Sequence, residues 1–261
     1  MKVAFVSLVM LALPATSAWA DARLDALLAA YPEWLASYTD DELIWKDGSR
    51  MPLGNRNARR PFAEMLERGS IREQFAIPYP PAAAPFRPPA TDEDPGRIRN
   101  EAFFVKMYGD CRRGEVTVKL RSVAWLPRHG GGTVRATTVN GVADQLEKVS
   151  RDLDALHADM IGYLIPMSGV YNCRTIAGTS RLSVHAFGAA VDINASFGDY
   201  WQWAPRADGA LVWRNRIPRE IVEVFERHGF IWGGRWYHFD SLHFEYRPEL
   251  ITLAKQGWPR E

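Results

Sequence analysis

The stretch SRLSVHAFGAAVDIN, residues 180–194, carries the clearest chemical pattern in the chain. Within it, His185 and Asp192 flank Gly188. Because glycine adopts backbone angles that other residues resist, a turn at Gly188 between two strands can bring both side chains to one point. We therefore expect this stretch to supply two ligands of a metal site.

A second stretch, GFIWGGRWYHFDSLHFEYRPE, residues 229–249, supplies the remaining groups. Its His243 lies far along the chain from His185 and must reach it by folding. Two imidazoles and one carboxylate suit Zn²⁺ and leave the fourth position open for water, which separates a catalytic zinc from a structural one. Asp240 stands shortly before His243, where a carboxylate can take a proton from water and pass it to a leaving amine. A single buried His or Asp is more often structural, so the prediction of one zinc ion rests on His185, Asp192, His243 and Asp240 together.

The order S-x-H-x-x-G-x-A-x-D, then W-G-G, then D-x-x-H resembles the LAS zinc metallopeptidases. This family includes D-Ala-D-Ala carboxypeptidases and dipeptidases, and phage-type L-alanyl-D-glutamate endopeptidases. The resemblance covers residues 135–250. It implies an α+β hedgehog/DD-peptidase-like fold, with a small antiparallel sheet flanked by helices, and hydrolysis of a peptide bond in peptidoglycan stem peptides.

The resemblance also assigns roles to individual residues. His185, Asp192 and His243 become the zinc ligands, and Asp240, where many relatives carry Glu, becomes the general base and acid. Relatives with Asp at this position occur among the endopeptidases, which favours that branch. Relatives also carry an arginine in a G-Y-R-S element that steadies the scissile carbonyl oxygen.

The nearest match to that element is the segment 168–175, SGVYNCRT, which makes Arg174 the candidate for stabilising the oxyanion. Two extra residues and a cysteine interrupt the element, so Arg181 is the alternative. Ser183 is either a substrate-binding or a turn residue. His238 is either a substrate-binding or proton-shuttling residue, or a polar strand residue.

Residues 1–20 have the pattern of a secretory signal peptide. Lys2 precedes an apolar run over residues 3–13, and Ala18-Trp19-Ala20 forms a small-residue cleavage site. A membrane anchor is the alternative, but the run is shorter than the roughly 20 residues that cross a bilayer. We expect cleavage after Ala20, no stable membrane anchor afterwards, and a location in the periplasm or outside the cell.

The chain has two cysteines, Cys111 and Cys173. An exported chain meets an oxidising compartment, where an even pair predicts a disulfide. The formal net charge of +1 gives no electrostatic footprint for DNA or RNA. We expect a monomer whose partner is a peptidoglycan stem peptide.

Residues 77–96 contain seven prolines, a density that excludes regular helix or strand and predicts an extended connection. The segment is either a disordered linker or a strap lying against the domain, and the interleaved Tyr79 and Phe86 favour the strap. We expect residues 21–96 to form a helical and proline-rich extension, followed by a zinc peptidase domain over residues 97–261.

Apolar periodicity predicts the remaining elements. Five tryptophans form either a cleft wall that stacks on glycan or peptide, or part of the core, and for Trp232 we expect the core. These tryptophans are Trp201, Trp203, Trp213, Trp232 and Trp236. The expected helices are 21–45, 61–68, 141–163 (with Asn140 as N-cap) and 218–228. The expected strands are 101–108, 115–125 and 133–139, and the expected turns are 46–49 and 130–132.

Two other functions compete with hydrolysis of a stem peptide. One is a binding module that keeps the zinc but performs no chemistry, which the presence of Asp240 argues against, because a structural metal needs no such carboxylate. The other is a zinc amidase that cuts the bond between glycan and peptide.

Overall fold

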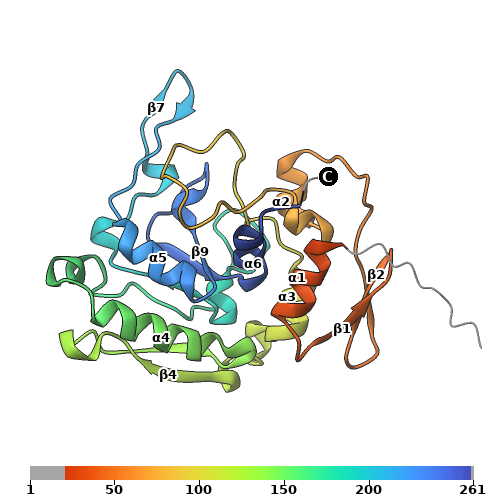
Figure 1. Cartoon of the computed structure of the whole chain (residues 1–261), viewed down its shortest axis with the longest axis horizontal. Helices are drawn as coiled ribbons and strands as arrows, with labels where there is room; N and C mark the ends of the chain where they lie inside the picture. Colours follow the sequence, from red (N-terminus) through yellow and green to blue (C-terminus); the bar gives the residue numbers. More distant parts are fainter. Residues whose placement is uncertain (1–20, 260–261) are drawn as a thin grey trace, which may run out of the picture.

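The structure is a computed structural model that describes residues 21–259, and it has mixed α+β architecture (Figure 1). The central sheet consists of β6 (Ala190–Asp192), β10 (His243–Tyr246) and β9 (Phe230–Trp232), all antiparallel, with β10 in the middle. Two helices, α5 (Arg219–Arg227) and α6 (Pro248–Gln256), pack against β9. The expected α+β class is confirmed, as is the helix that ends before Gly229.

A hairpin and a helix form a second unit beside the sheet (Figure 1). The hairpin pairs β4 (Leu120–Ala124) with β5 (Thr133–Thr137), and α4 (Val142–Asp154) packs on both strands. Both strands and the glycine turn were expected, although a 3₁₀ turn replaces the start of the first strand. The helix is shorter than the predicted 141–163 and is followed by a 3₁₀ helix, Ala158–Tyr163.

The predicted N-cap at Asn140 is wrong. Asn140 has a φ of 54°, and the left-handed Gly141 occupies the cap position without any side-chain hydrogen bond. The Asn140 amide instead contacts the Met107 sulfur at 3.8 Å. Two successive left-handed residues set the chain direction at this helix start, so no side-chain cap forms.

The predicted helix over residues 21–45 is wrong beyond its first part. The helix α1 covers Ala22–Ala30, and a small sheet of β1 (Leu35–Tyr38), β2 (Glu42–Trp45) and β3 (Arg50–Pro52) follows it. Pro32 explains the stop, because the residue before a proline is pushed out of the helical region. The turn at 46–49 and the helix α2 (Phe62–Arg68) agree with expectation.

The predicted strand over residues 101–108 is also wrong, because these residues form helix α3 (Glu101–Tyr108). The Asn100 side chain caps it by accepting a hydrogen bond from Phe103 N at 2.9 Å. The buried residues recur at helical spacing, which outweighs the strand propensity of their aromatic side chains. They are Phe103, Phe104, Met107 and Tyr108.

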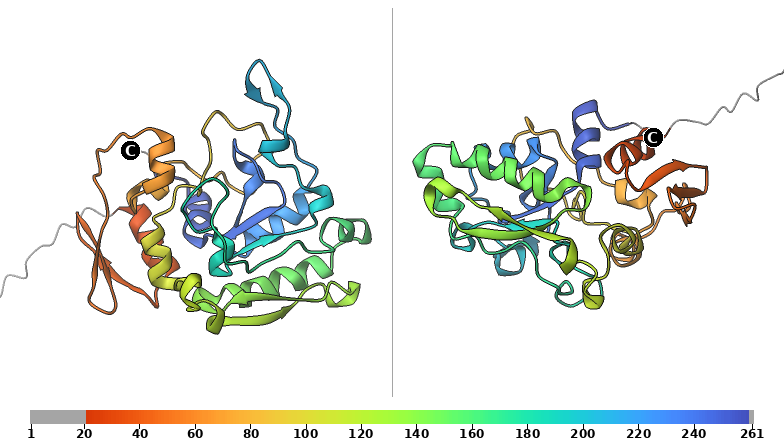
Figure 2. Two further views of the ribbon diagram at one scale, coloured as in Figure 1. Left: turned by 180° about the vertical axis from the view of Figure 1, so that it is seen from behind. Right: turned by 90° about the horizontal axis from the view of Figure 1, so that it is seen from below.

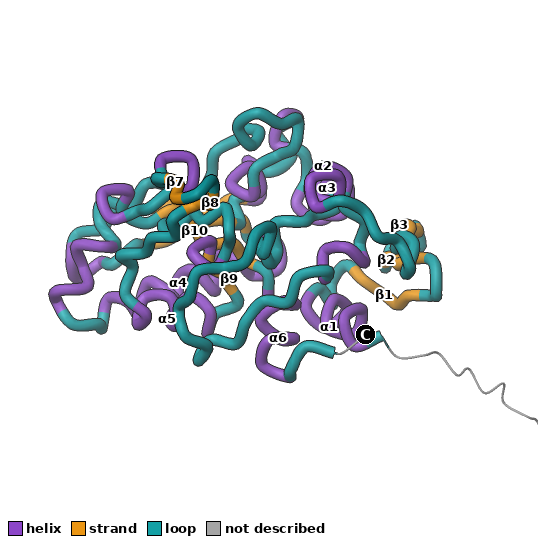
Figure 3. The backbone as a smooth tube through the Cα atoms, turned by 90° about the horizontal axis from the view of Figure 1, so that it is seen from above, coloured by secondary structure: helices purple, strands orange, loops and turns teal. Residues whose placement is uncertain are grey.

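The proline-rich segment forms no helix or strand and lies against the rest of the chain. Tyr79 is buried and donates a hydrogen bond to Glu226 of α5, and the ring of Phe86 lies 4.7 Å from that of Trp232. The segment is therefore a strap. The red and orange N-terminal elements lie at one side of the molecule (Figure 2), where α1 is placed beside α6 (Figure 3). One hydrophobic core runs through both parts of the chain, and a boundary at residue 96 stays a prediction.

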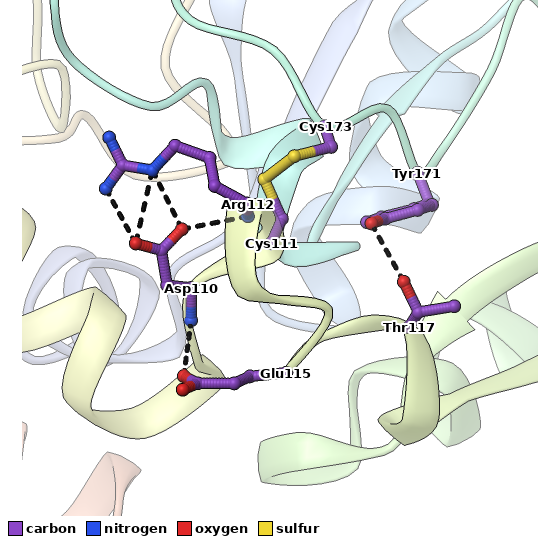
Figure 4. Close-up of a disulfide and its surroundings, with 7 residues drawn as sticks. All are labelled: Asp110, Cys111, Arg112, Glu115, Thr117, Tyr171 and Cys173. Atoms are coloured by element: carbon purple, nitrogen blue, oxygen red, sulfur yellow. Dashed lines mark hydrogen bonds and ion pairs between the residues drawn. A yellow bond between two sulfur atoms is a disulfide. The ribbon is translucent and has the colours of Figure 1, made fainter.

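Cys111 and Cys173 form the expected disulfide, with Cα atoms 5.7 Å apart (Figure 4). The bridge closes a loop with a sequence separation of 62, for which chain entropy gives roughly 4 kcal/mol of stabilisation. A hydrogen bond of 3.2 Å between the Thr117 and Tyr171 hydroxyls ties the same two segments together. The segment just before Arg174 is thus fastened to the chain after α3.

The predicted signal peptide lies outside the described residues. Among the helices of residues 21–259, none is long and apolar enough to cross a bilayer.

Candidate metal centre

The pairing of two short strands places two of the predicted ligands side by side. In the register of β10 with β6, His243 lies directly opposite Asp192. The His243 Nδ1 atom is 2.9 Å from Asp192 Oδ1. Adjacent strands of a sheet thus supply one imidazole and one carboxylate.

His185 comes from a 3₁₀ helix, Val184–Phe187, which ends at Gly188. The strand expected before Gly188 is therefore wrong, whereas the special backbone at Gly188 is present, with a φ of +68°. A Cβ atom at Gly188 would lie 2.7 Å from Leu120 Cδ2, so only glycine lets the turn approach the hairpin this closely. The turn brings His185 Nε2 to 3.1 Å from Asp192 Oδ2 and 3.2 Å from His243 Nδ1.

Each imidazole turns one nitrogen toward Asp192 and uses its other nitrogen on a second group. His185 Nδ1 donates to the Val170 carbonyl oxygen at 2.7 Å, and His243 Nε2 lies 3.3 Å from Glu245 Oε2. Ligating histidines generally donate their second N–H to a carbonyl or carboxylate in this way. His185 Nε2, His243 Nδ1 and an Asp192 oxygen all lie within 4.8 Å of one another. This donor set of two nitrogens and one oxygen fits Zn²⁺.

The charges around the three residues keep Asp192 ionised. Burial works to raise the pKa of Asp192, but hydrogen bonds from His185 and His243 outweigh it and hold that pKa well below its usual range. Burial alone would lower the pKa of His243, yet its hydrogen bonds with Asp192 and Glu245 raise it to about 10. Asp192 is therefore ionised in contact with both imidazoles, which is the protonation state that a metal-ligating carboxylate needs.

Asp240 lies at the edge of this cluster. Its backbone oxygen accepts a hydrogen bond from His243 N at 3.1 Å, and its backbone pairs with Tyr200. Burial raises the pKa of Asp240 to about 6; the positive charge of His243 opposes the rise and the negative charge of Asp192 adds to it. A carboxyl group with this pKa exchanges protons readily near neutral pH.

The two candidate arginines lie in different surroundings. Arg174 is exposed, and its guanidinium donates to the Thr175 carbonyl oxygen at 3.4 Å. Arg181 is buried and forms an ion pair of 3.3 Å with Glu67 of α2. Arg181 is thus committed to the N-terminal extension, whereas Arg174 keeps a side chain that can reach a ligand.

Two further expected site residues have well-defined surroundings. Ser183 is buried just before the 3₁₀ helix, and its hydroxyl makes no capping hydrogen bond there. His238 is partly buried, and its Nδ1 atom lies 2.7 Å from Asp94 Oδ2. Among the tryptophans, Trp232 and Trp236 belong to the core, as expected for Trp232. Trp203 is 80% exposed and shortly precedes β7 (Arg206–Ala207) in the sequence. The strands β7 and β8 (Ala210–Leu211) form a hairpin that projects from the molecule (Figure 1).

Three residues at the site were not singled out in the sequence: Asp94, Arg97 and Glu245. Glu245 had a usable signal, because residues two apart on a strand share a face and it follows His243 by two. Asp94 and Arg97 lie at and just beyond the end of the proline-rich strap, where no periodicity indicates which groups they meet.

Two imidazoles and a carboxylate beside a second, proton-accepting carboxylate define a candidate mononuclear metal centre of the hydrolytic kind. The family model described as D-alanyl-D-alanine carboxypeptidase matches residues 177–246, the span that holds all four of these side chains. The resemblance to this peptidase family is therefore confirmed over that span, and it supports peptidase activity. No curated protein and no solved structure matches the chain.

Proposed function

We propose that the chain is an exported zinc-dependent peptidase that hydrolyses a peptide bond in peptidoglycan stem peptides. In this proposal residues 97–261 have a DD-peptidase-like fold and act in the periplasm or outside the cell. The observation that carries it is the convergence of His185, Asp192 and His243 beside Asp240.

His185 Nε2, His243 Nδ1 and an Asp192 oxygen would hold the zinc ion. A bound zinc ion supplies Lewis-acid polarisation of a carbonyl oxygen and lowers the pKa of water. Asp240 accepts a proton from the water whose oxygen adds to the scissile carbonyl carbon. When the C–N bond breaks, Asp240 passes that proton to the leaving amine, and its pKa near 6 suits both directions of transfer.

The other side chains position the substrate. Arg174 follows Cys173 directly, so the disulfide limits the movement of its backbone, and its permanent charge would stabilise the oxyanion. Ser183 and His238 bind the substrate in this proposal, Ser183 through its hydroxyl and His238 through its Nε2 atom, whereas Arg181 stays paired with Glu67.

The test is turnover of defined stem peptides by the purified chain with and without a chelator. Loss of activity on chelation and its return with zinc are expected, and full activity without metal contradicts the proposal. The variant Asp240→Asn should bind zinc but lose turnover by at least about 100-fold. Asp47→Asn, at an exposed turn, is the matched control.

The two alternatives predict different results in the same assays. A non-catalytic binding module binds zinc and peptide but releases no product with either the parent chain or the control. A zinc amidase releases intact stem peptides from cell-wall fragments, which mass spectrometry separates from cleaved stems.

A further inference from the structure

The end of the proline-rich strap is fastened to the loop that leads into Asp240. The contacts are hydrogen bonds from the loop to the strap, made by backbone and side-chain donors alike. They run from Trp236 Nε1 to Pro95 O at 2.8 Å, from Tyr237 N to Glu93 O at 2.9 Å and from His238 N to Asp94 Oδ1 at 2.9 Å. The end of the strap is therefore fixed to this loop.

A buried carboxylate, that of Asp94, holds the strap and the loop together. The Asp94 side chain is fully buried, and its Oδ2 atom accepts from His238 Nδ1 at 2.7 Å. The same Oδ2 atom lies 3.4 Å from Arg97 Nη1, which also donates to the His238 carbonyl oxygen at 3.3 Å. One end of the Arg97 guanidinium is thus held in place.

The other end of Arg97 is available. Its Nε and Nη2 groups have no partner among residues 21–259, and its side chain is 18% exposed. Five donors in a rigid plane match a carboxylate through two parallel hydrogen bonds. A guanidinium held at one end loses little further freedom when it binds such a group.

Arg97 is also close to the proposed centre. Its guanidinium carbon lies 5.3 Å from the centre of the Trp236 ring, and the Trp236 ring lies 5.5 Å from that of His243. The Arg97 Nη1 atom donates to the carbonyl oxygen of His238, in the loop that leads into Asp240, at 3.3 Å. Arg97 therefore approaches the centre along the side on which Asp240 lies.

We propose that Arg97 binds a carboxylate on the residue whose amine leaves in the reaction, with Asp94 as the residue that positions it. This inference rests on the proposed function. Asp240 hands its proton to the leaving amine, so the leaving residue lies on the same side as Arg97. Both bonds that the proposed function allows place a carboxylate there: the terminal carboxylate in D-Ala-D-Ala and the α-carboxylate of D-Glu in L-Ala-D-Glu.

The experiment measures binding by calorimetry to the zinc-loaded chain in an Asp240→Asn background, which prevents turnover. Two pairs of stem peptides serve as probes: one pair ends in D-Ala-D-Ala as the free acid or the amide, and the other carries L-Ala-D-Glu with the α-carboxylate free or amidated. In at least one of the two pairs, the free acid should bind at least about tenfold more tightly than the amide. That pair identifies which carboxylate Arg97 recognises.

Adding Arg97→Gln should reduce this preference to within about twofold. Arg97→Lys keeps the charge but cannot form two parallel hydrogen bonds, so it should retain part of the preference. Arg87→Gln, on the same strap, removes an exposed arginine that pairs with the Glu93 side chain and should leave the preference intact. Zinc titration and thermal melting show whether each variant is folded. Asp94→Asn is a second variant that leaves Arg97 in place, and it should also lower the preference.

The outcomes separate this inference from the proposed function. Equal binding of acid and amide in both pairs, or a preference that survives Arg97→Gln, overturns the role of Arg97 alone. Failure of all four peptides to bind contradicts the proposed substrate and overturns both.

Discussion

His243 lies directly opposite Asp192 in the pairing of β10 with β6, and the two side chains meet at 2.9 Å. This register makes the sheet itself the scaffold of the site, because sliding one strand by a single residue would turn His243 to the opposite face. Glu245, two residues along β10, shares that face and reaches His243 Nε2. The strand thus carries both a ligand and the group that orients it.

The variant Glu245→Gln should lower zinc affinity by about 10- to 100-fold, because the charge that orients His243 and supports its basicity is lost. Arg99 would lose its carboxylate partner, whereas Arg247 would keep its ion pair of 2.6 Å with Glu249. Competition with a coloured chelator measures the zinc affinity directly. Glu42→Gln, at an exposed pair with Arg50, is the control, and equal affinities of the two variants would contradict the role of Glu245.

Replacing Gly188 with alanine should destabilise the fold more than the same change at Gly178. Both glycines have left-handed backbones, with φ of +68° and +76°, so both substitutions carry the roughly 1–2 kcal/mol strain of that conformation. At Gly188 the new Cβ also meets Leu120 Cδ2 at 2.7 Å, whereas at Gly178 nothing lies within 4 Å. We expect an excess of about 1–2 kcal/mol in the unfolding free energy lost at Gly188. Urea denaturation measures both variants, and identical losses would show that the hairpin does not press on this turn.

The sequence identified the chemical groups of the site better than the elements that carry them. The predicted ligands His185, Asp192 and His243 were identified from their order along the chain, which does not depend on the secondary structure around them. The ligands therefore meet as expected although the strand expected before Gly188 is a 3₁₀ helix. Asp94 and Arg97 could not be predicted from the sequence, because their role depends on the position of the strap. Long-range contacts determine this position, since the strap has no regular secondary structure. Elements with strong local signals, such as the helix ending before Gly229, were placed correctly.

Helix α3, which replaces the strand expected over residues 101–108, begins with an N-cap at Asn100 whose contribution to stability can be measured. Asn100→Ala removes the side-chain oxygen that accepts from Phe103 N and should cost about 1 kcal/mol of stability. Asn100→Asp keeps a capping oxygen but loses the bond that the Asn100 amide donates to the Gly69 carbonyl oxygen. Chemical denaturation of both variants separates the two contributions. A loss in Asn100→Asp as large as that in Asn100→Ala would assign the effect to Gly69 and not to the cap.

Glu73 should make the stability of the N-terminal extension depend on acid pH. Burial works to raise the pKa of Glu73, but hydrogen bonds from Arg60 and from Ser70 outweigh it and lower the pKa below its ordinary value of 4.5. A carboxylate whose pKa is lowered on folding contributes its full stability above about pH 4.5, and this contribution is lost as the pH falls through the folded-state pKa. The variant Glu73→Gln lacks that contribution at every pH. We therefore expect the unfolding free energy of the parent chain to exceed that of Glu73→Gln by about 2 kcal/mol at pH 7, and the difference to shrink as the pH falls below about 4.5. Comparing the two proteins cancels the titration of all other groups, so a difference that stays constant over this range would show that Glu73 titrates no differently in the folded and unfolded chains.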